Sequence, residues 1–539
     1  MNKRPTTTAG IAQYTPVLTR DQVAHLLKRT MFGATKADVD FFVGMTAAQI
    51  MAVLLTSPPT PPSPPLNNYS TGDPTVWDVV VPLGQTWVNS GNDNFNDNRI
   101  ASYKAWWIGQ MYSQTRSMQE KMVLFWHNHF STQAAPNSAR YAYTHNVMLR
   151  RNALGNFRTF AKEVSVDPLM LVFLNGYLNQ AGPDPDENYG RELQELFTVG
   201  KNADGASPFS EADVKAAAKV LTGYQIDAKN AKGIFTLSRH DTTDKQFSAF
   251  YSNTVIKGNP GSATASAGEL DQLLDMIFAT PNVAINIVQN IYRFFVYYVI
   301  DDTTFANVIQ PLATIFQNSK YDIKTLLQTL FTSQHFFDAS ILGALIKSPI
   351  ELSVSAVREF VGSFPPASNF QAQYNAWYQM YLVAQNLGQD LGDPPNVAGW
   401  LAYYQAPSYH ELWINTVTLP QRFNFVKILL GTGYPAAPYH IFIAPISVAS
   451  LFTDAADPNA LVADLVTLAY RLPVTANFTA TLKSALVGQV ADHYWSDLWN
   501  KYIGQVAAGI EDQPTIALVT SKLNALFQFL LNQPEFQLS

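Results

Sequence analysis

The chain has 539 residues, of which 47% are hydrophobic and 14% are charged, and its formal net charge is −6. This length allows a large core and normally more than one domain, while the charged fraction is low beside the roughly 25% of an average globular protein. No dense Lys/Arg run occurs, so the chain lacks the electrostatic footprint of a nucleic-acid binder or a basic membrane-surface protein. The absence of cysteine excludes disulfides, thiolate metal sites and a cysteine nucleophile.

Targeting and membrane signals are also missing from the sequence as written. The N-terminal MNKRPTTTAGIAQYTP has a basic start without the apolar stretch of a signal peptide. The most apolar segment, Ile287–Ile300, is interrupted by polar residues and is shorter than the roughly 20 residues that a membrane span needs. We therefore expect no transmembrane segment.

Apolar residues at helical spacing dominate the N-terminal part of the chain. A first helix is predicted over Asp21–Phe32 and a second over Thr35–Leu55. The proline-rich Ser57–Pro65 cannot lie in a helix or a central strand, so it is either a linker or a stiff strap on the surface. We favour the strap, because the preceding residues would bury little alone. A long aromatic stripe over Ala101–Phe130 predicts further helix.

The remaining pattern predicts many helices and one strand. The strand candidate is Lys232–Ser238, which would form a small hairpin, and Gly258–Gly268 reads as a flexible loop. Further helices are expected at Asn137–Leu149, Phe157–Val164, Asp167–Leu174, Glu211–Leu221, Gly268–Phe278, Val283–Val299, Thr303–Asn318, Ile323–Ser333, Gly343–Phe364, Gln371–Leu387 and Glu411–Leu430, with at least three more in Asn459–Asn532. The predicted fold class is all-α, a large multi-helix assembly with at most a small β-hairpin.

We expect a flexible segment over residues 1–20, followed by one helical unit over residues 21–539. A subdivision near residues 255–268 would separate a half that carries the polar groups, residues 21–257, from a helical half, residues 268–539.

The segment KMVLFWHNHFSTQ places His127 and His129 two residues apart. On a helix such side chains project about 200° apart, so they cannot bind one ion there. They converge only if the helix ends near Asn128, which the following Ser131 and Thr132 favour. Either both histidines are packed core groups, or they act as ligands or acid/base catalysts.

The segment DENYGRELQELFTVG predicts a second polar stripe on a capped helix. Asn188, Arg191, Glu192 and Glu195 fall on one face about 100° wide. Glu192 and Glu195 are suited to ligate a metal or to form an acid/base pair, with Asn188 and Arg191 as binding residues beside them. The alternative is a structural network of ion pairs and caps.

The loop SRHDTTDKQF follows the predicted strand and holds His240, Asp241 and Lys245. Loops after strands often carry functional groups. We take the histidine and the aspartate as candidate catalytic residues and the lysine as a candidate binding residue.

The segment Asp393–Asn415 is unusually rich in Pro, Gly, Trp and Tyr. Its Trp400, Tyr403 and Tyr404 are candidate binding residues for a sugar or a peptide. The segment is equally suited to be a rigid plug between helices.

No nucleophile elbow, P-loop, His-Glu-x-x-His or dinucleotide fingerprint occurs, so the common hydrolase, nucleotide-binding and zinc-peptidase signatures are missing. A divalent metal ion remains one interpretation of the polar residues. Its candidate ligands are His127, His129, Glu192 and Glu195.

The motifs together resemble the bacterial domain of unknown function 1800 family. The matching elements run in family order from about residue 20 to the end of the chain, and the NVAGWLAYYQ form resembles variants in Bacteroidetes. They are HLLKRTMFG, KMVLFWHNHF, RNALGNFRTFAKEVSVDPLML, ENYGRELQELFTVG, VKAAAKVLTGY, RHDTTDKQF, IKSPIEL, PPNVAGW and QPEFQLS. Asp186, Gly190 and Tyr224 depart from the family's usual Asn, Ala and Trp, and the polar set stays intact.

The resemblance implies an exported protein, periplasmic or extracellular, often encoded beside a sulfatase-like partner family. It assigns no activity. Because the chain as written has no signal peptide, a cytoplasmic location is the alternative.

Two functional hypotheses follow. In the first, the chain is an exported hydrolase of a glycan or another extracellular polymer, with His127, His129, Glu192, Glu195, His240 and Asp241 in one cleft, around a divalent metal ion or without one. In the second, the same groups form a buried structural network in a surface scaffold or binding module. A polysaccharide and a sulfatase-like protein are the partners considered.

Overall fold

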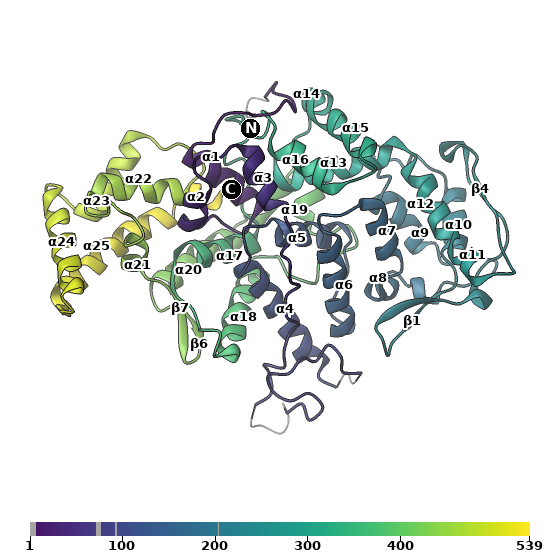
Figure 1. Ribbon diagram of the computed structural model, residues 1–539, viewed down its shortest axis with the longest axis horizontal. Coiled ribbons are helices and arrows are strands. Elements are labelled where there is room, and N and C mark those ends of the chain that lie inside the picture. Colours follow the sequence, from purple (N-terminus) through teal and green to yellow (C-terminus); the bar gives the residue numbers. More distant parts are fainter. Residues whose placement is uncertain (1–6, 72–76, 92–93, 203) are drawn as a thin grey trace.

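Helices dominate the computed structural model, which describes residues 7–71, 77–91, 94–202 and 204–539. The predicted mainly helical class is confirmed. The molecule is elongated, with the C-terminal helices at one end of its long axis and the segment from α8 to α12 at the other (Figure 1). The N-terminal helices α1 to α3 lie between them, close to the chain's C-terminus.

The first three helices are α1 (Arg20–Thr30), α2 (Lys36–Phe42) and α3 (Ala47–Leu54). The single helix predicted over Thr35–Leu55 is wrong, because Gly44 takes a positive φ of 91° and turns the chain. Thr46 then restarts the helix with a capping box to Gln49.

Residues 1–6 of the segment predicted to be flexible lie outside the described residues. From Thr7 onward, the segment lies against the turn after α16 (Ile323–Phe331). The Thr7 hydroxyl donates to Asp338 at 2.6 Å, and the Tyr14 N–H donates to the Thr332 carbonyl at 2.7 Å.

The proline-rich segment lies on the surface as a strap along α4 (Asn96–Tyr112). Trp106 Nε1 on α4 donates to the Ser63 carbonyl at 2.7 Å. The aromatic stripe predicted over Ala101–Phe130 is divided between α4 and α5 (Gln119–His129), with residues 113–118 as the connection. The next helices are α6 (Ala139–Asn152), α7 (Phe157–Ser165), α8 (Pro168–Phe173) and the 3₁₀ turn η2 (Gly176–Leu178).

The acidic helix changes its winding halfway along. It begins as α9 (Asn188–Glu192) and continues as the π-helix η3 (Leu193–Phe197). A π-turn adds about one residue per turn and is frequent at functional sites. Gly200, with a positive φ of 81°, follows the helix as predicted.

The strands form three small antiparallel sheets. The predicted hairpin pairs β2 (Lys232–Phe235) with β1 (Tyr224–Asp227). Two further sheets were not predicted from the sequence: β3 (Lys245–Gln246) with β4 (Val255–Ile256), and β5 (Val361–Ser363), β7 (Tyr439–Ile443) and β6 (Tyr434–Ala436) in that order.

The other helical elements lie in the middle of the chain, between α10 and α21. The predicted loop over Gly258–Gly268 contains a short helix, and the helix predicted over Gly343–Phe364 covers only Pro349–Phe360. In chain order they are α10 (Glu211–Val220), η4 (Leu237–Arg239), η5 (Ala249–Tyr251), α11 (Ala263–Ala267), α12 (Glu269–Phe278), α13 (Pro281–Phe295), α14 (Asp302–Thr304), η6 (Phe305–Ile309), α15 (Gln310–Asn318), α17 (Pro349–Phe360), α18 (Phe370–Asn386), α19 (Leu401–Tyr404), η7 (Tyr409–Trp413), α20 (Thr418–Leu430) and α21 (Pro445–Ala449).

The C-terminal lobe contains α22 (Pro458–Ala469), α23 (Ala476–Val487), α24 (His493–Ala507), α25 (Gln513–Leu531) and η8 (Pro534–Gln537). Four helices in the tail confirm the prediction of at least three. Among the described residues, α25 is the one helix that is long and apolar enough to cross a membrane, judged by length and composition alone. It packs against helices α20 to α24, as a core helix of this lobe would.

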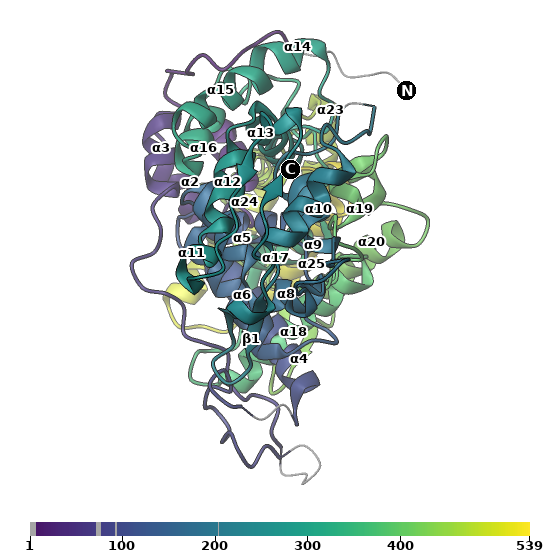
Figure 2. The same ribbon diagram turned by 90° about the vertical axis from the view of Figure 1, so that its right-hand side faces the viewer.

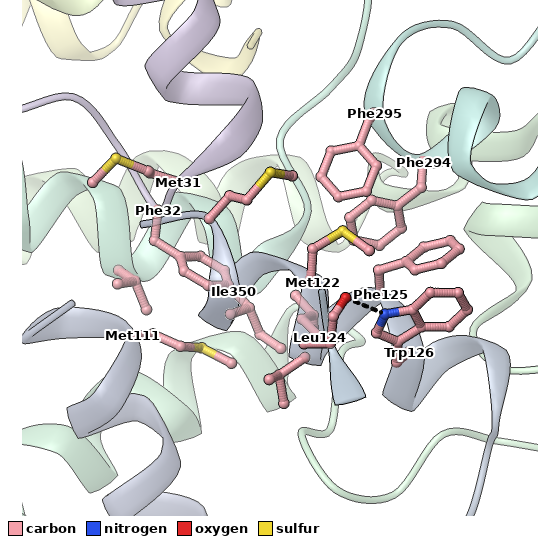
Figure 3. Close-up of a cluster of buried hydrophobic side chains, with 14 of the residues drawn as sticks. Met31, Phe32, Met111, Met122, Leu124, Phe125, Trp126, Phe294, Phe295 and Ile350 are labelled. Carbon is pink, nitrogen blue, oxygen red and sulfur yellow. Dashed lines mark hydrogen bonds between the residues drawn. The ribbon is translucent and has the colours of Figure 1, made fainter. Parts of the chain in front are cut away.

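The centre of the core surrounds α5. Every α5 residue from Glu120 to His129 is buried. Figure 3 shows Met122, Phe125 and Trp126 of α5 among side chains from α4, α13, α17 and the residues just after α1, with the Trp126 indole nitrogen hydrogen-bonded to a carbonyl oxygen. That acceptor belongs to Ala153, at 3.0 Å. Figure 2 shows α5 and α17 inside the molecule, behind the β1 end that faces the viewer.

Candidate functional site

The two histidines of α5 face different surroundings. The helix ends at His129, one residue beyond Asn128, and the two imidazoles still have different neighbours. His127 contacts the rings of Trp107 at 5.1 Å, Trp400 at 5.7 Å and His145 at 6.4 Å. Neither of its nitrogens has a hydrogen-bond partner, and burial lowers its pKa well below the usual value.

His129 holds one hydrogen bond and borders a cavity. Its Nε2 lies 3.0 Å from the Phe197 carbonyl oxygen. A carbonyl oxygen only accepts, so Nε2 carries the proton and Nδ1 keeps a free lone pair. Burial lowers the pKa of His129 to about 4, and the bond to Phe197 partly offsets this. The imidazole is therefore neutral at neutral pH.

The cavity beside His129 has a volume of about 140 Å³ and combines four of the predicted site residues. These are His129 from α5, Glu195 from η3, and Tyr403 and Tyr404 from α19. The remaining lining comprises Phe125, Asn128, Leu196, Asn286, Asn290, Phe294 and Ala398. The cavity thus has aromatic walls, three amide side chains, one imidazole and one carboxylate.

Both carboxylate oxygens of Glu195 have partners at this cavity. Its Oε1 accepts from Ser207 Oγ at 2.9 Å, and its Oε2 lies 2.9 Å from Lys201 Nζ. Glu192 lies one turn earlier and is not among the lining residues. Burial raises the pKa of Glu192, and the negative charge of Glu195 adds to the rise.

The other two members of the predicted stripe belong to a surface network. Arg191 pairs with Glu187 at 3.1 Å and with Glu211 at 2.6 Å. Asn188 is exposed, and its backbone N–H donates to Asp186 Oδ1 at 2.9 Å. The contacts of these two residues are those of a structural network of ion pairs and helix caps, which was the alternative to a binding role.

The loop before α19 is fastened to α5 by Asn128. Asn128 Oδ1 accepts from the Trp400 N–H at 2.9 Å. Gly399 has a positive φ of 93°, and a Cβ there would lie 2.3 Å from that same oxygen. Trp400 is buried against His127 and acts as a plug, whereas Tyr403 stacks on Phe294 at 4.7 Å and faces the cavity.

The third predicted segment forms a cluster of its own, with no residue in the His129 cavity. His240 Nε2 and Lys245 Nζ lie 3.2 Å and 2.5 Å from Glu269 Oε2, and all three side chains are buried. Asp241 accepts from the Thr243 N–H at 2.8 Å. The single cleft predicted for all the polar segments is therefore not assembled.

Sequence reasoning missed Glu269 and a buried pair between α6 and α8. His145 Nδ1 lies 2.8 Å from Asp167 Oδ2, and Asp167 also caps α8 through the Met170 N–H. The capping Asp-Pro pair at α8 is visible in the sequence, but its contact with His145 is tertiary. The side chains of Glu269 and Asn286 carry no local signal.

The described part of the chain contains no group of three or more His, Asp or Glu side chains that could hold a metal ion. The predicted set does not assemble one, because His127 and His129 face different neighbours and Glu192 lies outside the cavity lining.

Comparison with known families identifies the chain. Residues 25–538 match the family described as "Protein of unknown function (DUF1800)", and the chain belongs to that family. The match covers nearly the whole chain, as the motifs predicted. No curated protein and no solved structure matches the chain.

Proposed function

We propose that the cavity between α5, η3 and α19 is the reaction site of a hydrolase that cleaves a glycan or a related hydroxyl-rich polymer. The observation that carries the proposal is that His129 and Glu195 border one cavity. A neutral imidazole and a carboxylate on opposite elements are the groups that general acid–base hydrolysis requires.

His129 is suited to be the base. Its Nε2 proton is held by Phe197, so the ring is oriented and Nδ1 is the nitrogen left to accept a proton from water. The same Nδ1 would then return that proton to the departing sugar oxygen, so that no proton is left over. Glu195, which pairs with Lys201, would stabilise positive charge that develops on the imidazole or on the sugar ring. Glu192, whose pKa is raised, is the carboxyl of this segment best suited to hold a proton.

The cavity lining supports a neutral, hydroxyl-rich substrate. The rings of Phe294 and Tyr403 offer faces for stacking, and the Asn128, Asn286 and Asn290 amides offer donors and acceptors. The lining includes no lysine or arginine that would select an anion.

Export to the periplasm or the cell exterior and a sulfatase-like partner belong to the same proposal. They rest on the family resemblance, and the low charged fraction of the chain is compatible with a carbohydrate-facing surface. A bacterium of the Bacteroidetes type is the expected source on the same basis.

The second candidate function is a scaffold or binding module in which the polar residues form a buried structural network. Part of the predicted set supports this alternative. His127 and the cluster of His240, Lys245 and Glu269 are sealed from solvent. We assign these groups to the architecture and restrict the reaction to the His129 cavity.

The test is release of reducing ends from a panel of neutral polysaccharides. We expect His129→Gln and Glu195→Gln to lower the rate of release by about 100-fold or more. The matched controls are His493→Gln and Glu211→Gln, which change exposed residues and should leave the rate of release unchanged. Full activity of both cavity variants, or no release from any polysaccharide by the wild type, would contradict the proposal.

A further inference from the structure

A second cavity lies under the proline strap, away from the His129 cavity. It has a volume of about 420 Å³, within the roughly 300–1,000 Å³ typical of small-molecule sites. Pro58 to Pro62 of the strap form one wall, and the others come from the end of α4, residues 113–119 and α6. None of its lining residues is shared with the cavity at His129.

The strap is fixed on both sides of this wall. The Ser117 hydroxyl donates to the Thr56 carbonyl at 2.9 Å, before the prolines. Trp106 Nε1 donates to the Ser63 carbonyl at 2.7 Å, after them. Because proline also fixes its own φ, little backbone freedom remains to be lost when a ligand binds.

The opposite wall is a half-buried stripe on α6. Tyr143 and Val147 are one turn apart and face the same side of the helix. The Tyr143 ring packs on Trp106 at 5.5 Å, which holds it in place. Proline and tyrosine rings therefore line the same cavity, as apolar surfaces that suit the faces of a sugar ring.

Uncharged polar groups border these rings. Gln110 and Gln119 donate their amide N–H groups to the carbonyls of Trp106 at 3.3 Å and Arg150 at 2.9 Å. Their amide oxygens are then the atoms that they offer to a ligand hydroxyl. An acyl chain could not use these acceptors, whereas a saccharide could.

The charges in the lining are already neutralised in pairs. Arg150 donates to both carboxylate oxygens of Glu120, at 2.6 and 2.8 Å, and the pair is buried. Arg151 pairs with Glu163 at 2.5 Å. The Arg151 pair is solvent-exposed. An anionic ligand that used Arg150 would have to separate its buried pair with Glu120, which is costly.

We propose that the cavity under the strap is an accessory binding site for a neutral oligosaccharide. It holds the polymer beside the enzyme and takes no part in bond cleavage. The inference concerns equilibrium binding, so it does not require that the His129 cavity be catalytic.

The experiment is saturation-transfer NMR with neutral trisaccharides, namely cellotriose, maltotriose, xylotriose and mannotriose, on the full chain. Gln110→Trp fills the cavity from α4, and Pro59→Ala removes one exposed ring from the strap. Thr144→Trp is the control, because Thr144 lies on α6 next to the lining residue Tyr143 but lines a different hollow. Thermal melts confirm that each variant is folded.

We expect at least one trisaccharide to bind the wild type, the Thr144→Trp protein and the His129→Gln protein alike. Its affinity should fall at least about tenfold in Gln110→Trp and by a smaller factor in Pro59→Ala. Loss of binding in His129→Gln with full binding in Gln110→Trp would overturn this site and leave the proposed reaction site standing. Binding of an octyl-chain probe or a sulfated trisaccharide, and of no neutral one, would overturn the ligand class.

Discussion

Removing the His129 imidazole should flatten the response of the protein's stability to acid. Burial lowers the pKa of His129 to about 4 in the folded chain, against about 6.5 in an unfolded one. The unfolded state therefore binds the proton more readily, so the free energy of unfolding decreases as the pH falls from about 6.5 to about 4. Above that range this group does not change the stability. The pKa difference of about 2.5 corresponds to about 3 kcal/mol.

The assay is denaturant unfolding of the wild type and His129→Gln between about pH 7 and about pH 4. Glutamine can still donate to the Phe197 carbonyl and does not titrate. His25 and His127, whose pKa values are also lowered by burial, are present in both proteins and cancel in the difference.

We expect the wild type to lose about 3 kcal/mol more than the variant across this range. Parallel stability curves for the two proteins would refute the assigned burial and protonation state of His129, and with them the base proposed for the reaction.

Three further changes test the contacts around the site. His127→Phe should leave the melting temperature within a few degrees, or raise it, because the imidazole nitrogens have no hydrogen-bond partner; a large loss would show a polar role for His127. Gly399→Ala should destabilise the fold by about 2 kcal/mol or more and abolish activity, since its Cβ would meet Asn128; an unchanged denaturation midpoint would contradict the placement of the loop. Glu359→Gln should lower the free energy of unfolding by about 3–5 kcal/mol, because it removes a 2.7 Å ion pair and leaves the Lys28 charge buried. Adding Lys28→Met to the same chain should recover part of that loss, as measured by denaturant unfolding. If the single and double variants are equally unstable, the ion pair is contradicted.

Much of the secondary structure follows from local chemistry. The capping box at Ser210 and the alternation in β2 are readable without tertiary information, and the structure has both. The break between α4 and α5 escaped prediction because the aromatic stripes on its two sides were taken as one helical pattern, although residues 113–117 between them are polar. The π-turn at η3 escaped for a related reason, since a single inserted residue leaves no mark in composition.

The candidate site could be predicted only in part. His129 and Glu195 belong to the predicted set of polar residues, and both border one cavity. His127 was included although helix geometry already directed it about 200° away from His129. His240 found its partner in Glu269, a contact that depends on how α12 packs and leaves no signal in its own segment.

The most direct test of the reaction site is a ¹⁵N NMR titration of the His129 imidazole in the wild type, with a neutral trisaccharide added at the end. The ring should be neutral with its proton on Nε2 down to about pH 4, and the Nδ1 resonance should shift on addition of the saccharide. A protonated ring near pH 6, a proton on Nδ1, or an Nδ1 signal that no saccharide moves would contradict the proposed base.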